Sequence, residues 1–156
     1  MPPFDLRRTA AALQRAALAA VEPRAAVLRH VTRADDTLFI GDRRYHLPDY
    51  ERVFLIAAGK AAVPMSAAIV ERLGDRLTAG VVVAQRGSGG ETLPPPLTVI
   101  IGGHPLPDEG SLRGAQAALA LARRATARDL VICLISGGGS ALLTLPIPGL
   151  ELDALR

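Results

Sequence analysis

Aromatic residues are scarce in this chain of 156 residues, where they make up 3% of the sequence and tryptophan is absent. Proteins that bind single-stranded nucleic acid usually stack the bases on aromatic side chains beside a basic groove. The net charge is only +3, and the charged residues are scattered along the chain. The sequence therefore argues against a nucleic-acid partner.

Cysteine is nearly absent as well, because Cys133 is the only one. Its place inside an apolar run predicts a buried thiol in a reducing compartment, with no intramolecular disulfide. No uninterrupted apolar run reaches the roughly 18 residues of a membrane span. The N-terminal residues mix acidic and basic side chains and lack the apolar centre of a signal peptide. We therefore expect a cytoplasmic protein without a membrane partner.

Lysine is equally rare, since Lys60 is the single lysine among 18 basic residues. In a chain that otherwise uses arginine, a lysine indicates a task that needs a compact charge with freely rotating donors. Survival by chance is the alternative. Lys60 directly follows Gly59 at the end of an apolar run, which is a place where ligands are often bound.

Short apolar runs alternate with helix-like segments, and hydrophobic residues make up 49% of the chain, enough for a core. This alternation predicts an α/β fold with a mainly parallel, Rossmann-like sheet flanked by helices. We expect helices over residues 5–21, 23–30, 61–73 and 110–127, a hairpin over 37–47, and strands over 53–58, 80–84, 97–101 and 130–135. One face of the last long helix is apolar and consists of Ala115, Ala118, Leu119 and Ala122.

Three of the expected strands end in unusual sequences, which are Gly59-Lys60, GGHP over 102–105 and SGGGS over 136–140. Ligands bind beyond the carboxyl ends of parallel strands, so these three segments are expected to converge on one rim. The glycines of the last segment allow positive φ and close backbone approach. Its successive amides, which open a helix between two hydroxyls, predict an anion cradle. A merely flexible turn is the alternative.

Two further side chains lie near these strand ends. His104 is either a site residue on the rim or a histidine satisfied within the core. Asp108 is either a site residue or only the N-cap of the following helix. The three histidines are far apart in the sequence and have no cysteine or glutamate at ligand spacing, so no protein metal site is expected.

The usual nucleotide and hydrolase signatures are missing. Ala61 stands after Gly59-Lys60, where a Walker A loop needs Ser or Thr. No G-x-G-x-x-G opens a helix, which disfavours dinucleotide binding. A nucleophile elbow around Ser140 would need glycine where Leu142 stands.

Three motifs in one order nevertheless resemble a known family. AAGKAA over 57–62, GHPLPD over 103–108 and LISGGGSALL over 134–143 are similar to motifs of the class II glycerate kinases, sometimes labelled hydroxypyruvate reductases. The resemblance covers nearly the whole chain. It implies two α/β domains with the active site between them, and transfer of the γ-phosphoryl group of ATP, with Mg²⁺, to D-glycerate. Most members of the family form 2-phosphoglycerate.

The resemblance also implies roles for residues. Lys60 would be the catalytic lysine and Asp108 a cofactor-binding residue. Substrate or phosphate would be bound by Gly59, His104, Ser136, Gly137, Gly138, Gly139 and Ser140. The chain departs from the family pattern at Ala57, where glycine is usual, and at Ile101-Gly102, where an acidic residue and alanine are frequent.

The family chain is more than twice as long, and its second domain carries a catalytic arginine. Residues 1–156 are therefore expected to be the N-terminal portion of the Rossmann-like domain and to be inactive alone. A sheet cut at this point would expose one edge and an apolar face, with poor solubility. The alternatives are a non-catalytic module that binds an anion or nucleotide, and an NAD(P)H-dependent hydroxypyruvate reductase. A homo-oligomer is a further open alternative.

Overall fold

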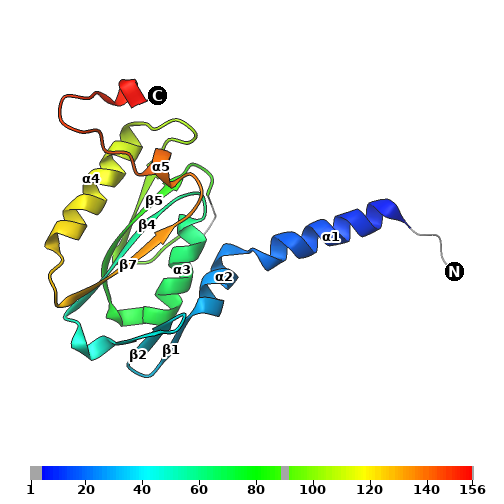
Figure 1. Ribbon diagram of the computed structural model, residues 1–156, viewed down its shortest axis with the longest axis horizontal. Helices are drawn as coiled ribbons and strands as arrows, with labels where there is room; N and C mark the ends of the chain where they lie inside the picture. Colours follow the sequence, from blue (N-terminus) through cyan, green and yellow to red (C-terminus); the bar gives the residue numbers. More distant parts are fainter. Residues whose placement is uncertain (1–4, 89–91, 156) are drawn as a thin grey trace.

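A parallel sheet of four strands forms the centre of the molecule (Figure 1). The computed structural model describes residues 5–88 and 92–155. The strands lie in the order β6-β5-β4-β7, and all three neighbouring pairs are parallel. Their bounds are β4 Arg52–Ala58, β5 Leu77–Gln85, β6 Leu97–Gly102 and β7 Asp129–Ile135. The prediction of a parallel α/β sheet is confirmed.

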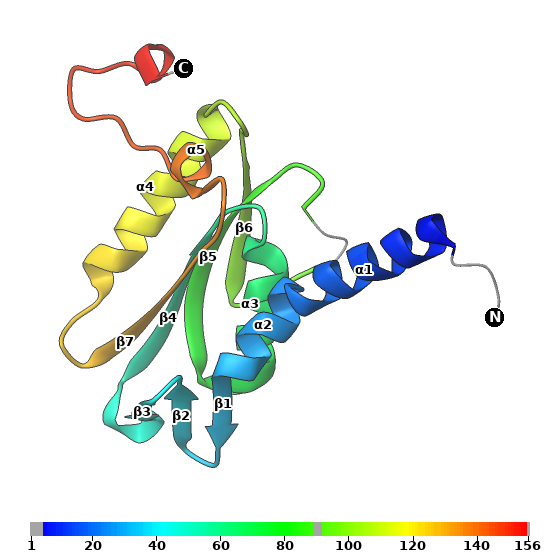
Figure 2. The same cartoon turned by 45° about the vertical axis from the view of Figure 1, so that its right-hand side comes forward.

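Helices lie on both faces of this sheet. Helices α2 (Pro23–His30) and α3 (Ala62–Leu73) pack on one face, and α4 (Glu109–Arg124) packs on the other (Figure 2). Because β4 lies between these layers, every residue of this strand after Arg52 is buried. Short helical turns complete the chain: α5 (Gly139–Leu142), η1 (Leu47–Asp49), η2 (Gly74–Arg76) and η3 (Leu152–Leu155).

The N-terminal part confirms two predicted helices and adds one strand. Helix α1 (Leu6–Ala20) begins after Asp5, whose carboxylate accepts hydrogen bonds from the amides of Arg7 and Arg8. This helix has no buried residue and extends away from the sheet (Figure 1). The expected hairpin is present as β2 (Thr37–Ile40) and β3 (Arg43–His46), and β1 (Val31–Ala34) pairs with β2 beside it. Strand β1 was not predicted, because a strand of four residues carries little periodicity in the sequence.

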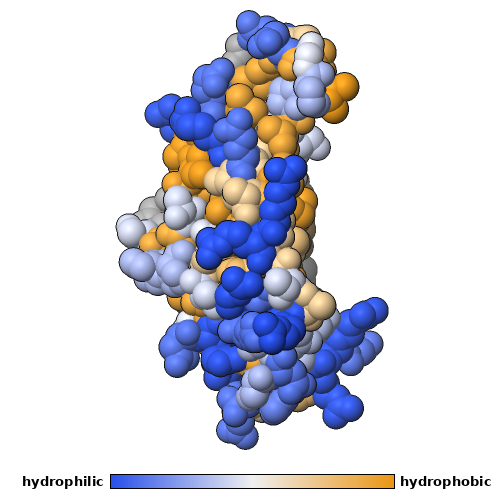
Figure 3. Space-filling model, turned by 90° about the vertical axis from the view of Figure 1, so that its left-hand side faces the viewer, coloured by the Kyte–Doolittle hydropathy of each residue, from blue (hydrophilic) through white to orange (hydrophobic). Residues whose placement is uncertain are grey.

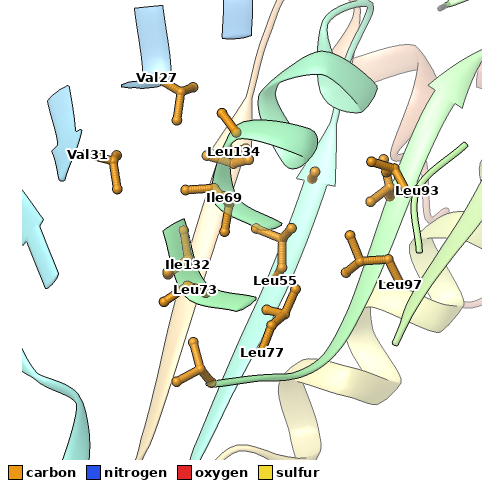
Figure 4. Close-up of a cluster of buried hydrophobic side chains, with 14 of the residues drawn as sticks. Val27, Val31, Leu55, Ile69, Leu73, Leu77, Leu93, Leu97, Ile132 and Leu134 are labelled. Carbon is orange, nitrogen blue, oxygen red and sulfur yellow. The ribbon is translucent and has the colours of Figure 1, made fainter. Parts of the chain in front are cut away.

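The larger hydrophobic cluster fills the face covered by α2 and α3 (Figure 4). Leu55 of β4 and Ile69 of α3 are completely buried there, and Ile132 and Leu134 of β7 join them. The labelled side chains of this cluster are Val27, Val31, Leu55, Ile69, Leu73, Leu77, Leu93, Leu97, Ile132 and Leu134.

The smaller cluster lies between the sheet and α4. It contains Phe54, Ile56, Val83, Ala118, Leu121 and Leu142, among others. Gly114 brings α4 close to β5, because a Cβ atom on Gly114 would lie 2.7 Å from a methyl carbon of Val83. Close approach at one glycine fixes the height of α4 above the sheet.

Strand β7 is the edge of the described sheet and is covered on one side only. Leu130, Ile132 and Leu134 are buried, whereas Val131, Cys133 and Ile135 are exposed, Ile135 to 60%. The prediction of a buried Cys133 is wrong, because α4 crosses β5 and β6 and does not reach the α4-side face of β7. The expected free edge and apolar face are both present. Within residues 5–88 and 92–155, no helix has the length and apolar character needed to cross a membrane.

A charged contact holds the amino ends of β4 and β7 together. Arg52 Nε donates to Asp129 Oδ1 at 2.8 Å, and Arg52 Nη2 donates to Asp129 Oδ2 at 2.7 Å. The Thr126 amide also donates to Asp129, at 2.7 Å. The hydrogen bonds from Arg52 hold the pKa of Asp129 well below its ordinary value. This contact lies at the end of the sheet opposite to the glycine loops.

Candidate functional site

The loops after β4 and β7 are bonded to each other at the carboxyl end of the sheet. The Lys60 amide donates to the Gly137 carbonyl at 2.9 Å, and the Ser136 amide donates to the Ala58 carbonyl at 3.0 Å. The Ser136 hydroxyl accepts a hydrogen bond from the Ala61 amide at 3.0 Å. Ser136 therefore connects the two loops, and its predicted ligand contact stays a prediction.

Gly59 is required by this contact between loops. Its φ is +128°, and a Cβ atom on it would lie 2.7 Å from the carbonyl oxygen of Ser136. Any larger residue would push the two strand ends apart. The prediction that Gly59 and the 136–140 segment lie on one rim is thus confirmed.

The third strand end reaches the same place through His104. Gly138 has φ +89°, and a Cβ atom on it would lie 2.7 Å from His104 Cδ2 and 3.3 Å from Lys60 Cγ. The imidazole ring and the aliphatic stem of Lys60 therefore flank the backbone of Gly138. This arrangement brings together the three segments that the sequence placed at three separate strand ends.

The cationic group of Lys60 is available to a ligand. Lys60 and His104 are both exposed. Among the described residues, no hydrogen bond or ion pair involves Lys60 Nζ, and none uses the amides of Gly137 and Gly138. The next amide of the loop, that of Gly139, donates to the Ser136 carbonyl at 3.2 Å. One ammonium group and two backbone amides therefore remain free at the same rim, which suits an anionic ligand.

Asp108 acts as the N-cap of α4, one of the two alternatives that the sequence left open. Its Oδ1 accepts from the Ser111 amide at 3.0 Å and from the Gly103 amide at 2.8 Å. The hydrogen bond from the Ser111 amide is the main cause that lowers the pKa of Asp108. These bonds hold the backbone next to His104, and a direct contact of Asp108 with a cofactor stays a prediction.

Ser111 is a site-supporting residue that sequence analysis missed. It is completely buried, and its hydroxyl accepts from the Gly103 amide at 3.0 Å. With Asp108 it forms a reciprocal capping box at the start of α4. The spacing of a capping box, with polar residues three positions apart before a helix, was the available signal.

Arg86 was missed as well, although it follows β5 as Lys60 follows β4. A polar cavity of about 340 Å³ lies beside His104 and is lined by Gln85, Arg86, Gly102, Gly103, His104 and Asp108. A second cavity of about 410 Å³ lies beyond Ser140, and its lining includes Pro105, Leu106 and Thr144. The signal for Arg86 was its position just past the end of a predicted parallel strand. In the described part of the chain, no three His, Cys, Asp or Glu residues could together hold a metal ion.

Comparison with known proteins places these features in a family. A family model described as "Domain of unknown function (DUF4147)" matches residues 9–156. The chain is 39% identical over 153 residues to the glycerate 2-kinase of Pyrococcus horikoshii. The matched region is 98% of this chain and 33% of that relative. It is 41% identical over 128 residues to the glycerate kinase of Rattus norvegicus, and this matched region is 74% of this chain and 24% of the relative. A relative from Agrobacterium vitis, 39% identical over 102 residues, bears the name hydroxypyruvate reductase.

Solved structures agree with the sequence comparison. A Pyrococcus horikoshii protein superposes with a TM-score of 0.81 at 39% identity, over 98% of this chain and 34% of its own. The glycerate kinase of Thermotoga maritima superposes with a TM-score of 0.62 at 39% identity, over 65% of this chain and 24% of its own. The chain thus spans about a third or less of the length of these relatives.

Proposed function

Because this chain belongs to the DUF4147 family, which forms the N-terminal part of glycerate kinase, we propose that it supplies part of the site for ATP-dependent phosphorylation of D-glycerate. The observation that carries this proposal is the meeting of Lys60, the backbone of Gly138 and His104 at one rim. The name glycerate 2-kinase, borne by the Pyrococcus relative, favours 2-phosphoglycerate as the product.

Lys60 is the residue to which we assign the largest effect on the reaction. Phosphoryl transfer depends mostly on positioning and on stabilisation of charge. The backbone of Lys60 is fixed by its bond to Gly137, while its ammonium group is exposed and unpaired among the described residues. It would neutralise charge on the transferring phosphoryl group or on the glycerate carboxylate.

The glycine loop would hold phosphate oxygens through the amides of Gly137 and Gly138, for which residues 5–88 and 92–155 offer no hydrogen-bond acceptor. His104, whose ring lies against Gly138, would contact the substrate on the same side as Lys60. Gly59 and Ser136 act indirectly, because they hold the two loops together.

ATP and Mg²⁺ are the cofactors of this proposal. Magnesium bound to ATP would neutralise phosphate charge, and it prefers phosphate and water oxygens to an all-protein cage. Magnesium would then reach the site on the phosphates of ATP, and the rim would bind those phosphates through hydrogen-bond donors. No cluster of carboxylates for the ion itself is present in the described ranges. The proposal includes a cytoplasmic location and a missing partner domain that completes the site. We expect the 156-residue chain to be inactive alone.

A chimera tests the proposal directly. The matching N-terminal third of the Pyrococcus glycerate 2-kinase is replaced by this chain, and formation of ADP with D-glycerate is followed. We expect turnover by the chimera and none by the 156-residue chain, with 2-phosphoglycerate identified by phosphorus NMR. Oxidation of NADH with hydroxypyruvate, without ADP formation, would instead support a reductase.

A further inference from the structure

An apolar groove lies on the α4 side of the sheet. Its volume is about 310 Å³, and it is lined by Ile56, Ala115, Ala118, Leu119, Ala122, Leu143 and Leu145. None of these side chains is charged or polar. The apolar face that the sequence predicted for α4, from Ala115 to Ala122, therefore borders an open groove instead of the core alone.

The floor of this groove continues onto the edge strand. In the parallel register, Ile56 pairs with Cys133 and Ala58 pairs with Ile135, so these residues point to the same face of the sheet. Cys133 and Ile135 are both exposed. Figure 3 looks onto the α4 side and shows most of the apolar residues in the upper half of the molecule, between hydrophilic ones, whereas the lower half is mainly hydrophilic. The apolar surface is thus wider than the groove itself.

The connections of the sheet predict which element belongs there. The connection from β4 through α3 to β5 runs toward β6, and the connection from β6 through α4 to β7 runs the opposite way. Crossovers between parallel strands are almost always right-handed, which is why α3 and α4 lie on opposite faces. A further strand beyond β7 would be reached by moving in the same direction as from β6 to β7. Its connecting helix would therefore lie on the same face as α4.

The end of the described chain lies in a suitable place. After α5 the chain passes to η3, which lies at the carboxyl end of the sheet in both views (Figures 1 and 2). A helix that starts there and runs antiparallel to β7 would pass along the groove. The Pyrococcus relative is about three times as long as the portion matched here, because this chain covers 33% of it.

We propose that the groove seats an amphipathic helix from the part of glycerate kinase that follows this portion. The helix connects β7 to a strand that pairs with its free edge. The small side chains of Ala115, Ala118 and Ala122 allow close approach, since helices that pack on each other lie about 8–10 Å apart. The proposal concerns assembly and is independent of the phosphoryl-transfer chemistry.

Cys133 offers a direct measurement, because it is the only cysteine and lies on the floor of the proposed interface. Its rate of reaction with a small disulfide reagent is measured in the 156-residue chain and in the Pyrococcus chimera, and the labelled peptide is identified by mass spectrometry. We expect Cys133 to react at least about 100-fold more slowly in the chimera, because a packed helix must open first.

The control is a cysteine outside the groove. In a Cys133→Ser background, Asp42→Cys places a thiol in the exposed turn between β2 and β3. This thiol should react at similar rates, within about threefold, in the short chain and in the chimera. If the chimera does not fold, a cysteine placed in the Pyrococcus protein at the position aligned with Cys133 should be protected to the same extent.

A pair of substitutions tests the groove itself. Leu119→Lys puts a charge into the groove, and Gln116→Lys puts the same charge on an exposed position of the same helix. In the chimera, only Leu119→Lys should increase the reactivity of Cys133, by about tenfold or more. In the short chain both variants should fold equally well, because the groove is open there.

Two results would overturn the proposal. One is a Cys133 that reacts equally fast in the short chain and in the chimera. The other is protection of Cys133 in the short chain that increases with protein concentration together with dimer formation by light scattering, because a second copy would then occupy the groove.

Discussion

Strand β7 carries apolar side chains on both faces, yet helices cover only one of them. Ile132 and Leu134 are buried beneath α2 and α3, whereas Cys133 and Ile135 are exposed on the α4 side. A strand that is apolar on both sides is typical of a sheet covered on both faces. The sequence of β7 is therefore suited to a strand with helices on both faces, but residues 5–88 and 92–155 cover only the face beneath α2 and α3.

The rim at the carboxyl end behaves differently from either face. Its order comes from backbone contacts between loops, such as those of Gly59 with Ser136 and of Gly138 with His104. Such contacts need no helix above them. The rim of Lys60, Gly138 and His104 is therefore formed within this chain even where the neighbouring face of the sheet is open.

The largest effect is expected on the stability of the chain, when a side chain on the covered face of β7 is shortened and compared with its neighbour on the open face. Leu134→Ala in the 156-residue chain should lower the free energy of unfolding by about 2–5 kcal/mol, because Leu134 is 8% exposed and its loss leaves a cavity. Ile135→Ala should change it by about 0.5 kcal/mol or less, since Ile135 is 60% exposed. Denaturant titration measures both, and equal effects would contradict the difference between the faces.

The next prediction separates the rim from the sheet. Lys60→Ala in the chimera should reduce kcat for D-glycerate by about 100-fold or more, because one fixed positive charge is lost. The unfolding midpoint should stay unchanged, since Lys60 is exposed. Lys60→Arg should also fail, because a planar guanidinium does not replace a compact ammonium group. Near-normal turnover of Lys60→Ala would rule out the proposed role.

A smaller effect is expected where the rim depends on a glycine. Gly138→Ala should reduce kcat/KM of the chimera by about tenfold, because the added methyl group would displace His104 and the stem of Lys60. Gly149→Ala is the matched control, since Gly149 has nearly the same φ, +87°, and no atom within 4 Å of the added Cβ. Both variants carry similar backbone strain, so equal loss of activity would point to strain instead of the contact.

The smallest effect concerns the opposite end of β7. Asp129→Asn should destabilise the chain at neutral pH, because the pKa of Asp129 is lowered by Arg52 in the folded state. A carboxyl group whose pKa is lower in the folded state than in the unfolded state stabilises the fold at any pH above the unfolded-state pKa. This stabilisation is lost as the pH falls from the unfolded-state pKa to the folded-state pKa. The wild type and the variant should therefore converge as the pH falls below the ordinary value of 3.8. A difference that stays constant from pH 7 to pH 3 would exclude this origin.

The main elements are visible in the sequence because their signals are local. The apolar runs that became β4 and β7 and the Asp5 N-cap of α1 were all visible as short patterns. The support of the site was harder to find. The capping-box spacing indicates a cap for Ser111, but its hydrogen bond with the Gly103 amide is seen only in the folded turn between β6 and α4. Arg86 shares a cavity with His104 only because β5 and β6 end side by side.

The sequence by itself determined the α/β architecture, the order of the three glycine-containing strand ends and the resemblance to glycerate kinases. Alternation of apolar runs and helices, and motifs at fixed spacing, are properties of neighbouring residues. Only the tertiary structure decided that Gly138 lies between His104 and Lys60, that Asp108 caps α4, and that Cys133 is exposed. The contact of Gly138 with His104 and Lys60 and the exposure of Cys133 depend on which distant segments lie beside each other. The role of Asp108 is decided locally, by the hydrogen bonds that it accepts from the Gly103 and Ser111 amides. The burial of a side chain is set by the segment that packs on it and not by its own hydrophobicity.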